Sequence, residues 1–351
     1  MERSLIAHNC TCYEDKILCI STDYNLVFRV DCKTKTLELM DICPNEYLFG
    51  KYLFSDIFIN NNELILTPCY SDKISIYHID DNRWEYIYLQ EKTQGMWFKF
   101  SRCIVQEEWL YLIPNFYRKF LRLNLRSHKL EELDLYNQIC SKLHNTDGGF
   151  LHRDYVVIDD NIFIPVLGTN QLIQLDFNSM KAKLIQIGSE SNKYMGITED
   201  ENGDYWLSPR RNSSIVRFTK EKKVIEYPLP KEFANDDYHF SGAYERDGEI
   251  VFPGMRNKSL IFSPYDPNDY RVISEREIFH KREKDYFVTQ NDAGVLRFRN
   301  SDFDKEVICK IDDDAIINWI IQHKTGENIS WIDKLLQEDT NMNLKIYMNT
   351  I

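Results

Sequence analysis

Glycine is scarce in this 351-residue chain, which contains only 13 glycines. The scarcity argues against a cofactor site lined by glycine, and the sequence has no glycine-rich phosphate loop. Two further catalytic signatures, the GxSxG nucleophile elbow and the HExxH zinc motif, are also missing. The common motifs of nucleotide binding, serine hydrolysis and zinc proteolysis therefore give no starting point for a function.

Long apolar runs are missing as well. No segment approaches the roughly 18 apolar residues of a membrane helix, and the first residues contain no apolar core of signal-peptide length. The formal net charge is −12, which disfavours binding to nucleic acid or to an anionic membrane through bulk charge. We therefore expect a cytoplasmic protein that has neither a nucleic acid nor a membrane as its partner.

The nine cysteines are an odd number and form no CxxC pairs of the kind that bind zinc. Most of them fall within apolar strand patterns, as Cys19 and Cys309 do, and there they behave as small buried hydrophobic residues. Cys10 and Cys12 lie two residues apart on a predicted strand and would share one of its faces, so a metal or redox role for this pair is an alternative. The cysteine content favours a reducing compartment.

The strongest positive feature is a repeat of apolar, strand-like runs that end at a proline. Five such runs occur, and the spacings between their prolines are 46, 51, 44 and 44 residues. Proline cannot donate a hydrogen bond to a sheet, so it fits the end of a strand. A repeat of about 40–50 residues built from short strands is typical of a β-propeller blade. The five prolines are Pro68, Pro114, Pro165, Pro209 and Pro253.

The same template extends to both ends of the chain and predicts seven units. Each unit has four short antiparallel strands, and the second strands end near residues 22, 68, 114, 165, 209, 253 and 298. The last unit contains only three predicted strands, at 286–288, 295–298 and 306–309. The predicted fold class is therefore all-β, a seven-bladed β-propeller of four-stranded antiparallel blades over residues 1–311.

Residues 312–351 are predicted to form a short helical extension. Three aspartates at 312–314 precede a helical pattern at 315–321, and a second short helix is predicted at 329–336. Residues 343–348 return to the alternation of a strand. This terminal strand is predicted to become the fourth strand of the last blade; a loosely docked tail is the alternative.

One unit, at 195–230, carries a resemblance to a known family. Its segments MGITEDENGDYWLS at 195–208, NSSIVRF at 212–218 and VIEYPLP at 224–230 resemble a repeat of the streptogramin lyase family. The other units look kelch-like. The resemblance implies a seven-bladed propeller and a metal-dependent elimination that opens a cyclic depsipeptide. That family uses histidines on the innermost strands and a metal-binding glutamate at the end of a second strand, whereas the matching second-strand positions here hold Pro209 and Pro253.

Histidines near the predicted starts of the innermost strands are the candidate catalytic residues. Counting back 14 residues from each second-strand end places His8 and His239 in one register, and His152 misses it by one residue. Imidazoles that converge at the mouth of a central channel could bind a divalent metal or act as a general base near neutral pH. Structural histidines held by hydrogen bonds are the alternative. No cofactor is certain from the sequence, and a divalent metal is the one that this pattern suggests.

Arginines in the predicted loops between second and third strands are the candidate ligand-binding residues. These loops should lie on the same face as the starts of the innermost strands. Arginine side chains match carboxylate and phosphate groups with two parallel hydrogen bonds, so this face could form a funnel for an anion, with tyrosines available to stack. Solvated loop charges, or pairs with Asp23 and Asp72, are the alternative. The candidates are Arg118, Arg210, Arg211, Arg256 and Arg299, together with Tyr70 and Tyr117.

Three functions follow from these patterns. The first is a cytoplasmic ligand-binding, peptide-binding or scaffold propeller whose arginine-lined top face recognises an anionic group on a small molecule or on a peptide or protein segment. The second is a metal-assisted lyase or hydrolase that resembles streptogramin lyase and uses His8, His152 and His239. The third is a propeller that serves only protein–protein interaction. The fold alone does not choose among them, because propellers host many unrelated activities.

Overall fold

The computed structural model describes residues 2–4, 7–14, 16–21, 26–31, 33–44, 53–90, 98–117, 119–143, 154–210, 213–233, 240–254, 258–274, 277–283, 286–291, 295–300, 304–308, 310–312, 315, 318–319 and 322. The chain divides into two compact units. One unit is Ile6–Ile308, and the other combines Met1–Leu5 with Cys309–Ile351.

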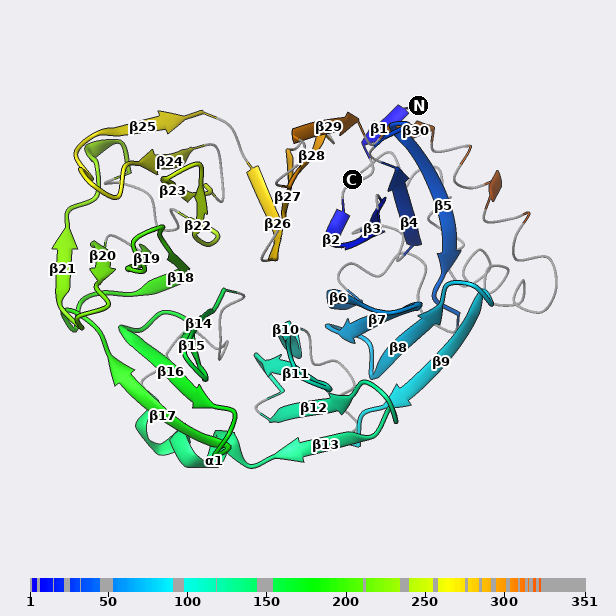
Figure 1. The fold of residues 1–351 in the computed structure, drawn as a ribbon, viewed down its shortest axis with the longest axis horizontal. Coiled ribbons are helices and arrows are strands. Elements are labelled where there is room, and N and C mark those ends of the chain that lie inside the picture. The colour runs from blue at the N-terminus through cyan, green and yellow to red at the C-terminus, as the bar shows by residue number, and fades with distance from the viewer. Residues whose placement is uncertain are drawn as a thin grey trace, which may run out of the picture. The chain divides into compact units, whose positions relative to one another are not determined.

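The larger unit contains seven four-stranded antiparallel sheets, and each sheet uses four strands that follow one another in the sequence (Figure 1). The first three sheets are formed by β2 (Ala7–Tyr13), β3 (Lys16–Ser21), β4 (Leu26–Asp31) and β5 (Thr36–Ile42); β6 (Phe54–Asn60), β7 (Glu63–Pro68), β8 (Lys73–His78) and β9 (Arg83–Tyr88); and β10 (Phe100–Gln106), β11 (Trp109–Pro114), β12 (Phe120–Asn124) and β13 (Leu130–Leu133).

The remaining four sheets of this unit repeat the same order. They are formed by β14 (Val156–Ile158), β15 (Asn161–Pro165), β16 (Gln171–Asp176) and β17 (Lys181–Gln186); β18 (Tyr194–Glu199), β19 (Tyr205–Pro209), β20 (Ile215–Phe218) and β21 (Val224–Tyr227); β22 (Tyr244–Arg246), β23 (Glu249–Phe252), β24 (Ser259–Phe262) and β25 (Tyr270–Ile273); and β26 (Glu277–Glu283), β27 (Tyr286–Asn291), β28 (Val295–Asn300) and β29 (Asp304–Ile308). The fold class of the unit is all-β.

The position of a strand in its sheet decides how much of the strand is buried. In the second strands β7 and β11 every residue after the first is buried, whereas the fourth strands β9 and β21 are exposed or half-buried throughout. A strand that is buried on both faces reads as a continuous apolar run, which explains why the proline-ended runs are second strands. The prolines that end β7, β11, β15 and β19 are Pro68, Pro114, Pro165 and Pro209, as the repeat predicts.

Hydrophobic clusters join successive sheets of this unit. One cluster contains Leu18 of the first sheet and Leu64 of the second, and another contains Ile65 of the second sheet and Leu112 of the third. Three more clusters join the third sheet to the fourth, the fourth to the fifth and the fifth to the sixth. Strand β2 of the first sheet also contacts β26 of the last. The core is therefore a series of interfaces between sheets, as in repeat proteins whose units pack on their neighbours.

The last sheet corrects one prediction. Its four strands all come from residues 277–308, and the segments predicted as its first, second and third strands are β27, β28 and β29. The first strand, β26, was not predicted from the sequence because Glu277–Glu283 mixes apolar residues with four charged ones. The terminal segment 343–348, predicted to supply a missing fourth strand, lies outside the described residues. The sheet does not need it, since β29 occupies that position.

Helices are few in the described part of the chain. They are α1 (Leu135–Ile139), which packs against β17, and the 3-10 helices η1 (Cys140–Lys142) and η2 (Lys231–Phe233). None of the helices that the structure describes is long and apolar enough to cross a membrane.

The smaller unit contains a two-stranded antiparallel sheet of β1 (Glu2–Ser4) and β30 (Lys310–Asp312), in which Arg3 is paired with Ile311. The described residues Ala315, Asn318, Trp319 and Gln322 are helical, which agrees with the helix predicted at 315–321. The helix predicted at 329–336 lies outside the described residues. The predicted division into residues 1–311 and 312–351 stays a prediction.

The described cysteines are mostly small core residues, as predicted. Cys10, Cys19 and Cys69 are buried, and Cys12 is half-buried. Cys10 and Cys19 are directly opposite each other on β2 and β3, and their Sγ atoms are 3.0 Å apart. Cys10 therefore contacts the thiol of Cys19 on the neighbouring strand. A joint metal or redox role of Cys10 with Cys12 stays a prediction.

Candidate functional site

A β-bulge recurs near the start of the innermost strands. The pairing register shifts by one residue after the first pair in β2, β6, β10 and β18, and after the third pair in β26. Bulges change the direction of the side chains that follow and are common beside functional sites. The residues left out of the pairing are His8, Ser55, Ser101, Met195 and His280.

The bulge also sets the register of the predicted histidines. His8 directly follows Ala7, which is paired with Ser21, whereas His239 precedes Phe240, which forms the equivalent bridge to Gly254. His8 and His239 therefore do not share a register: His8 follows the first paired residue of its strand and His239 precedes the equivalent residue. Counting by a constant 14 residues failed because the true second-strand end differs by one residue in two sheets. His152 and His239 themselves lie outside the described residues.

Asp56 is the centre of a buried hydrogen-bond network that links the first three sheets. Its Oδ1 accepts from Asn9 Nδ2 at 2.7 Å and from the Ile57 amide at 2.9 Å. Its Oδ2 accepts from the Cys103 amide at 2.9 Å and from Cys103 Sγ at 3.2 Å. Because Asn9 lies on β2 and Cys103 on β10, this one carboxylate contacts an innermost strand on each side of its own.

Arg102 lies next to this network and is buried, with 5% of its surface exposed. Burial by itself lowers the pKa of the guanidinium, but the nearby carboxylates Asp56 and Asp154 raise it, and the net shift is upward. Arg102 is therefore a charged group in the interior, and its charge is balanced by two buried carboxylates that come from different sheets.

Asp154 occupies space that two glycines leave open. Its Oδ2 accepts a hydrogen bond from the Ala243 amide at 2.9 Å. A Cβ atom added to Gly196 would lie 2.3 Å from the same oxygen, and one added to Gly242 would lie 2.6 Å from it. Glycine at both positions lets the fourth, fifth and sixth sheets come together around this carboxylate.

The buried cationic side chains gather at one end of the sheets. Lys99 is fully buried, donates from Nζ to the Tyr70 carbonyl at 2.7 Å and pairs with Asp72 at 3.2 Å. Arg210 directly follows the last residue of β19 and is 7% exposed. Both positions lie where innermost strands begin and second strands end. We call this end the cationic face; the buried lysines and arginines that the described residues place there are Lys73, Lys99, Arg102 and Arg210.

The predicted ligand-binding residues that the structure describes differ in position and exposure. Tyr70 is 42% exposed beside Lys99. Tyr117 is 5% exposed and packs against Phe100, with 5.0 Å between ring centroids, so its ring belongs to the core. Arg299 lies within β28, opposite Phe287, and not in a loop between second and third strands. The prediction placed it one strand too early because β26 was missed. Arg118, Arg211 and Arg256 lie outside the described residues.

Sequence reasoning missed Lys73, Lys99 and Arg102, because each stands beside apolar residues that look like ordinary core. A usable signal was present. The first paired residue of three innermost strands is phenylalanine followed by serine, at Phe54 and Phe100 and, in the bridge to Gly254, at Phe240. The residue after that serine is Asp56, Arg102 or Gly242, and all three belong to the buried polar region.

Metal-ligating side chains are not grouped in the part of the chain that the structure describes. No set of three or more histidine, cysteine, aspartate or glutamate side chains there is arranged to hold a metal ion. This statement does not cover the three predicted histidines, because the side chains of His8, His152 and His239 are not described.

Comparison with solved structures identifies the fold. A streptogramin B lyase matches with a TM-score of 0.58 at 13% identity over 88% of this chain and 95% of that chain. The fold is a streptogramin lyase-like β-propeller. A catalytically inactive variant of virginiamycin B lyase from Staphylococcus aureus, solved with quinupristin, matches with a TM-score of 0.59 at 12% identity over 88% and 96% of the two chains.

A designed protein shares the propeller architecture as well. The computationally designed Ika8 protein matches with a TM-score of 0.55 at 6% identity over 85% of this chain and 84% of that chain. No family model and no curated protein matches the sequence. At these identities the β-propeller likeness concerns the fold alone, so the resemblance predicted from residues 195–230 is confirmed at the level of the fold. The kelch-like character of the other units stays a prediction.

Proposed function

We propose that this protein is a cytoplasmic, seven-bladed binding propeller whose cationic face recognises an anionic group on a small molecule or a peptide segment. Each four-stranded sheet serves as one blade, and the contact between β2 and β26 brings the first and last blades together. The ligand approaches where the innermost strands begin, close to Arg102 and Arg210.

The observation that carries this proposal is the placement of buried positive charge. The chain has a net charge of −12, yet the four buried lysines and arginines of the described residues all lie at one end of the sheets. Lys99 and Arg102 already lie beside protein carboxylates, so Arg210 is the cation of this face that we propose meets the ligand. A face that collects several such cations is suited to a carboxylate or phosphate, which arginine binds with two parallel hydrogen bonds. Exposed Tyr70 offers a ring for stacking beside them.

Replacing Arg210 with alanine tests the proposal. A hydrogen bond to a charged group contributes about 1.5–3 kcal/mol, so we expect Arg210→Ala to weaken binding of an anionic probe by about tenfold or more. The measurement is the shift in thermal unfolding midpoint as citrate or inorganic pyrophosphate is titrated, because a ligand that binds only the folded state raises that midpoint.

Arg126→Ala is the matched control, since it removes the same charge from an arginine that is 84% exposed at the opposite end of the sheets. It should leave the response to citrate and pyrophosphate unchanged. Equal responses of the two variants and the unaltered protein, or no response in any of them, would contradict anion recognition at the cationic face.

A metal-assisted lyase or hydrolase is the second candidate, favoured by one observation. His8 on β2 and His280 on β26 are each left out of the pairing at a bulge, and these two innermost strands contact each other. With His152 and His239, they would be the candidate metal ligands or bases. This function predicts a stoichiometric divalent metal in protein purified without a tag, and loss of that metal in His8→Ala and His239→Ala. Elemental analysis that finds no metal would contradict it.

A further inference from the structure

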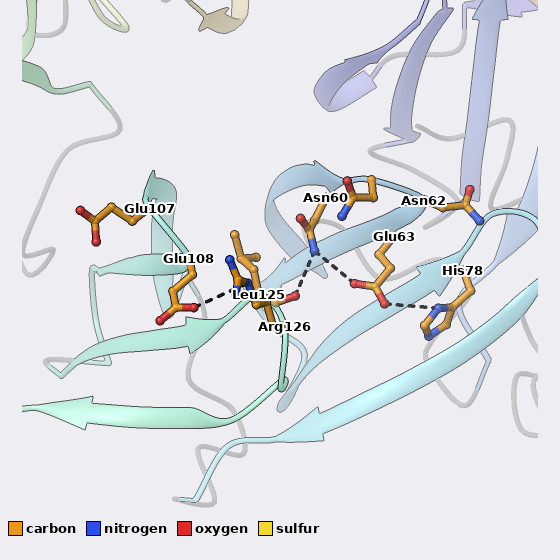
Figure 2. A pocket seen from close by; sticks show the side chains of 9 residues that line it. Asn60, Asn62, Glu63, His78, Glu107, Glu108, Leu125 and Arg126 are labelled. Atoms are coloured by element: carbon orange, nitrogen blue, oxygen red, sulfur yellow. Dashed lines mark hydrogen bonds and ion pairs between the residues drawn. The ribbon is translucent and has the colours of Figure 1, made fainter.

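A cavity of about 770 Å³ lies at the end of the sheets opposite the cationic face, between the second and third sheets (Figure 2). Its walls include Glu63 and His78 from the second sheet and Glu108, Leu125 and Arg126 from the third. Figure 2 shows polar side chains reaching across the seam between the two sheets. Asn60 Nδ2, for example, donates to the Leu125 carbonyl at 3.0 Å and to Glu63 at 3.4 Å.

Two histidines and two glutamates alternate around a closed circuit at this seam. His128 Nε2 lies 3.1 Å from Glu63 Oε2, and His128 Nδ1 lies 3.0 Å from Glu85 Oε1. His78 faces the same two carboxylates, with Nδ1 3.5 Å from Glu63 Oε1 and Nε2 3.4 Å from Glu85 Oε2. Three members belong to β7, β8 and β9, and His128 comes from the turn between β12 and β13 of the next sheet. We call these four side chains the His–Glu clip.

The turn that carries His128 is built to hold it in place. Asn124 Oδ1 accepts from the amides of Arg126 at 3.1 Å and Ser127 at 2.9 Å, and the His128 amide donates to the Asn124 carbonyl at 2.9 Å. His128 has a φ of 55°, a left-handed conformation that histidine adopts more readily than most residues. The imidazole therefore reaches the second sheet from a turn whose backbone is held by its own hydrogen bonds.

The geometry favours a protonated His128 when both carboxylates are ionised. An ionised carboxylate only accepts hydrogen bonds, and a neutral imidazole has one N–H, whereas an imidazolium has two. Both ring nitrogens of His128 lie within 3.1 Å of a carboxylate oxygen, so both contacts are hydrogen bonds only in the charged form. Burial lowers the pKa of His128, but the hydrogen bonds to Glu85 and Glu63 raise it and the net shift is upward. Burial raises the pKa of Glu85, and the hydrogen bond from His128 lowers it, with a net downward shift.

Several other charged groups on the packed elements pair with one another. Glu131 pairs with Arg122 and with Lys129, each at 2.8 Å. Glu108 pairs with Arg126 at 3.7 Å. Glu132 pairs with Lys119 at 3.1 Å. Further charged residues on these turns and strands are Lys73, Arg83, Glu107, Asp80 and Asp81. Within the clip, the charged ring of His128 faces the two carboxylates of Glu63 and Glu85.

We propose that the His–Glu clip is a proton-dependent latch that joins the second and third sheets and forms one wall of the cavity between them. With His128 protonated, its ring holds Glu63 and Glu85 together beside His78 and the seam is closed. When His128 loses its proton, one of the two carboxylates faces a nitrogen lone pair instead of an N–H. That contact becomes repulsive, the seam loosens, and the Glu63–His78 wall of the cavity is released. The latch is independent of anion recognition at the cationic face.

The direction of the pH dependence follows from linkage. The pKa of His128 is raised above its ordinary value of 6.5, so its contribution to stability is complete below about pH 6.5 and is lost as the pH rises through the folded-state value. The pKa of Glu85 is lowered below 4.5, so its contribution is present above about pH 4.5 and is lost as the pH falls through the folded-state value. The latch is therefore strongest between these two limits.

The test measures the unfolding midpoint of the full-length protein, and amide exchange at the seam between the second and third sheets, as a function of pH. We expect the unfolding midpoint to fall as the pH is raised above 6.5, and His128→Gln to remove most of that fall. After correction for the intrinsic rise of amide exchange with pH, protection of the amides around Asn60–Glu63 and Leu125–Lys129 should fall over the same pH range in the unaltered protein only. Lys129→Gln is the control: it removes a positive charge from the same turn and should keep the full pH dependence.

If His128→Gln does not fold, NMR chemical shifts of the imidazole ring of His128 in the unaltered protein test the latch instead. A His128 ring that stays charged above pH 6.5 supports the latch. A ring that loses its proton below that value, or a pH dependence that is the same in His128→Gln and the unaltered protein, would overturn it.

Discussion

Asp56→Ala is expected to lower the free energy of unfolding by about 3–5 kcal/mol, the usual result of removing one partner from a buried charged pair. Asp56 is 1% exposed, and its loss leaves the charge of Arg102 with one of its two buried carboxylates. It also leaves Asn9 Nδ2 and the Cys103 amide without the oxygen atoms that they contact at 2.7 and 2.9 Å. Urea unfolding at neutral pH, followed by tryptophan fluorescence, measures the change.

Two variants separate the causes of that loss. Asp56→Asn keeps an oxygen acceptor but removes the negative charge, so it should lie between the unaltered protein and Asp56→Ala. Asp81→Ala removes an aspartate from the exposed turn before β9 and should leave the unfolding midpoint unchanged. If Asp56→Ala were no more harmful than Asp81→Ala, the network around Asp56 would contribute nothing to holding the first three sheets together.

Gly196→Ala is expected to be strongly destabilising. Its Cβ would lie 2.3 Å from Asp154 Oδ2 and 2.7 Å from backbone atoms of Gly242. Overpacking of a core costs typically about 1–3 kcal/mol and occasionally more, and backbone atoms of a neighbouring strand cannot swing away as a flexible side chain can. We therefore expect a loss of about 3 kcal/mol, measured by the same urea unfolding.

Gly203→Ala is the matched control for this glycine. Gly203 has a φ of +80°, and the nearest atom to its added Cβ would be 3.7 Å away, so the variant carries a conformational cost of about 1–2 kcal/mol without a clash. A double-mutant cycle with Asp154→Ala should recover part of the loss in Gly196→Ala, because the shared oxygen is removed. An additive cycle would show that the carboxylate is not the obstacle.

Strong local patterns made much of the propeller predictable. Second strands such as β7 are buried on both faces, so they need uninterrupted apolar residues and end at prolines such as Pro68. The innermost strand β26 was missed because its seven residues include four charged ones. The predicted second-strand ends at residues 22 and 253 each differ by one residue from the paired residues Ser21 and Gly254, and this error placed His8 and His239 in one register.

The candidate site was harder to predict than the fold. Arg210 could be found because it follows a proline-ended strand and so had to lie in a loop. Lys99 and Arg102 could not, because a buried cation depends on carboxylates that distant segments supply: Asp56 and Asp154 lie 46 and 52 residues from Arg102 along the chain. The same holds for His128 and Glu63, which are 65 residues apart and meet only when two sheets pack.

The most direct test of ligand recognition at the cationic face is hydrogen–deuterium exchange with and without a saturating anionic probe such as citrate. We predict slower exchange in peptides that contain Tyr70, Lys99, Arg102 and Arg210, and unchanged exchange in peptides that contain Glu63 and His128 at the opposite end of the sheets. Protection confined to the peptides of Glu63 and His128, or no protection anywhere, would contradict the proposed function.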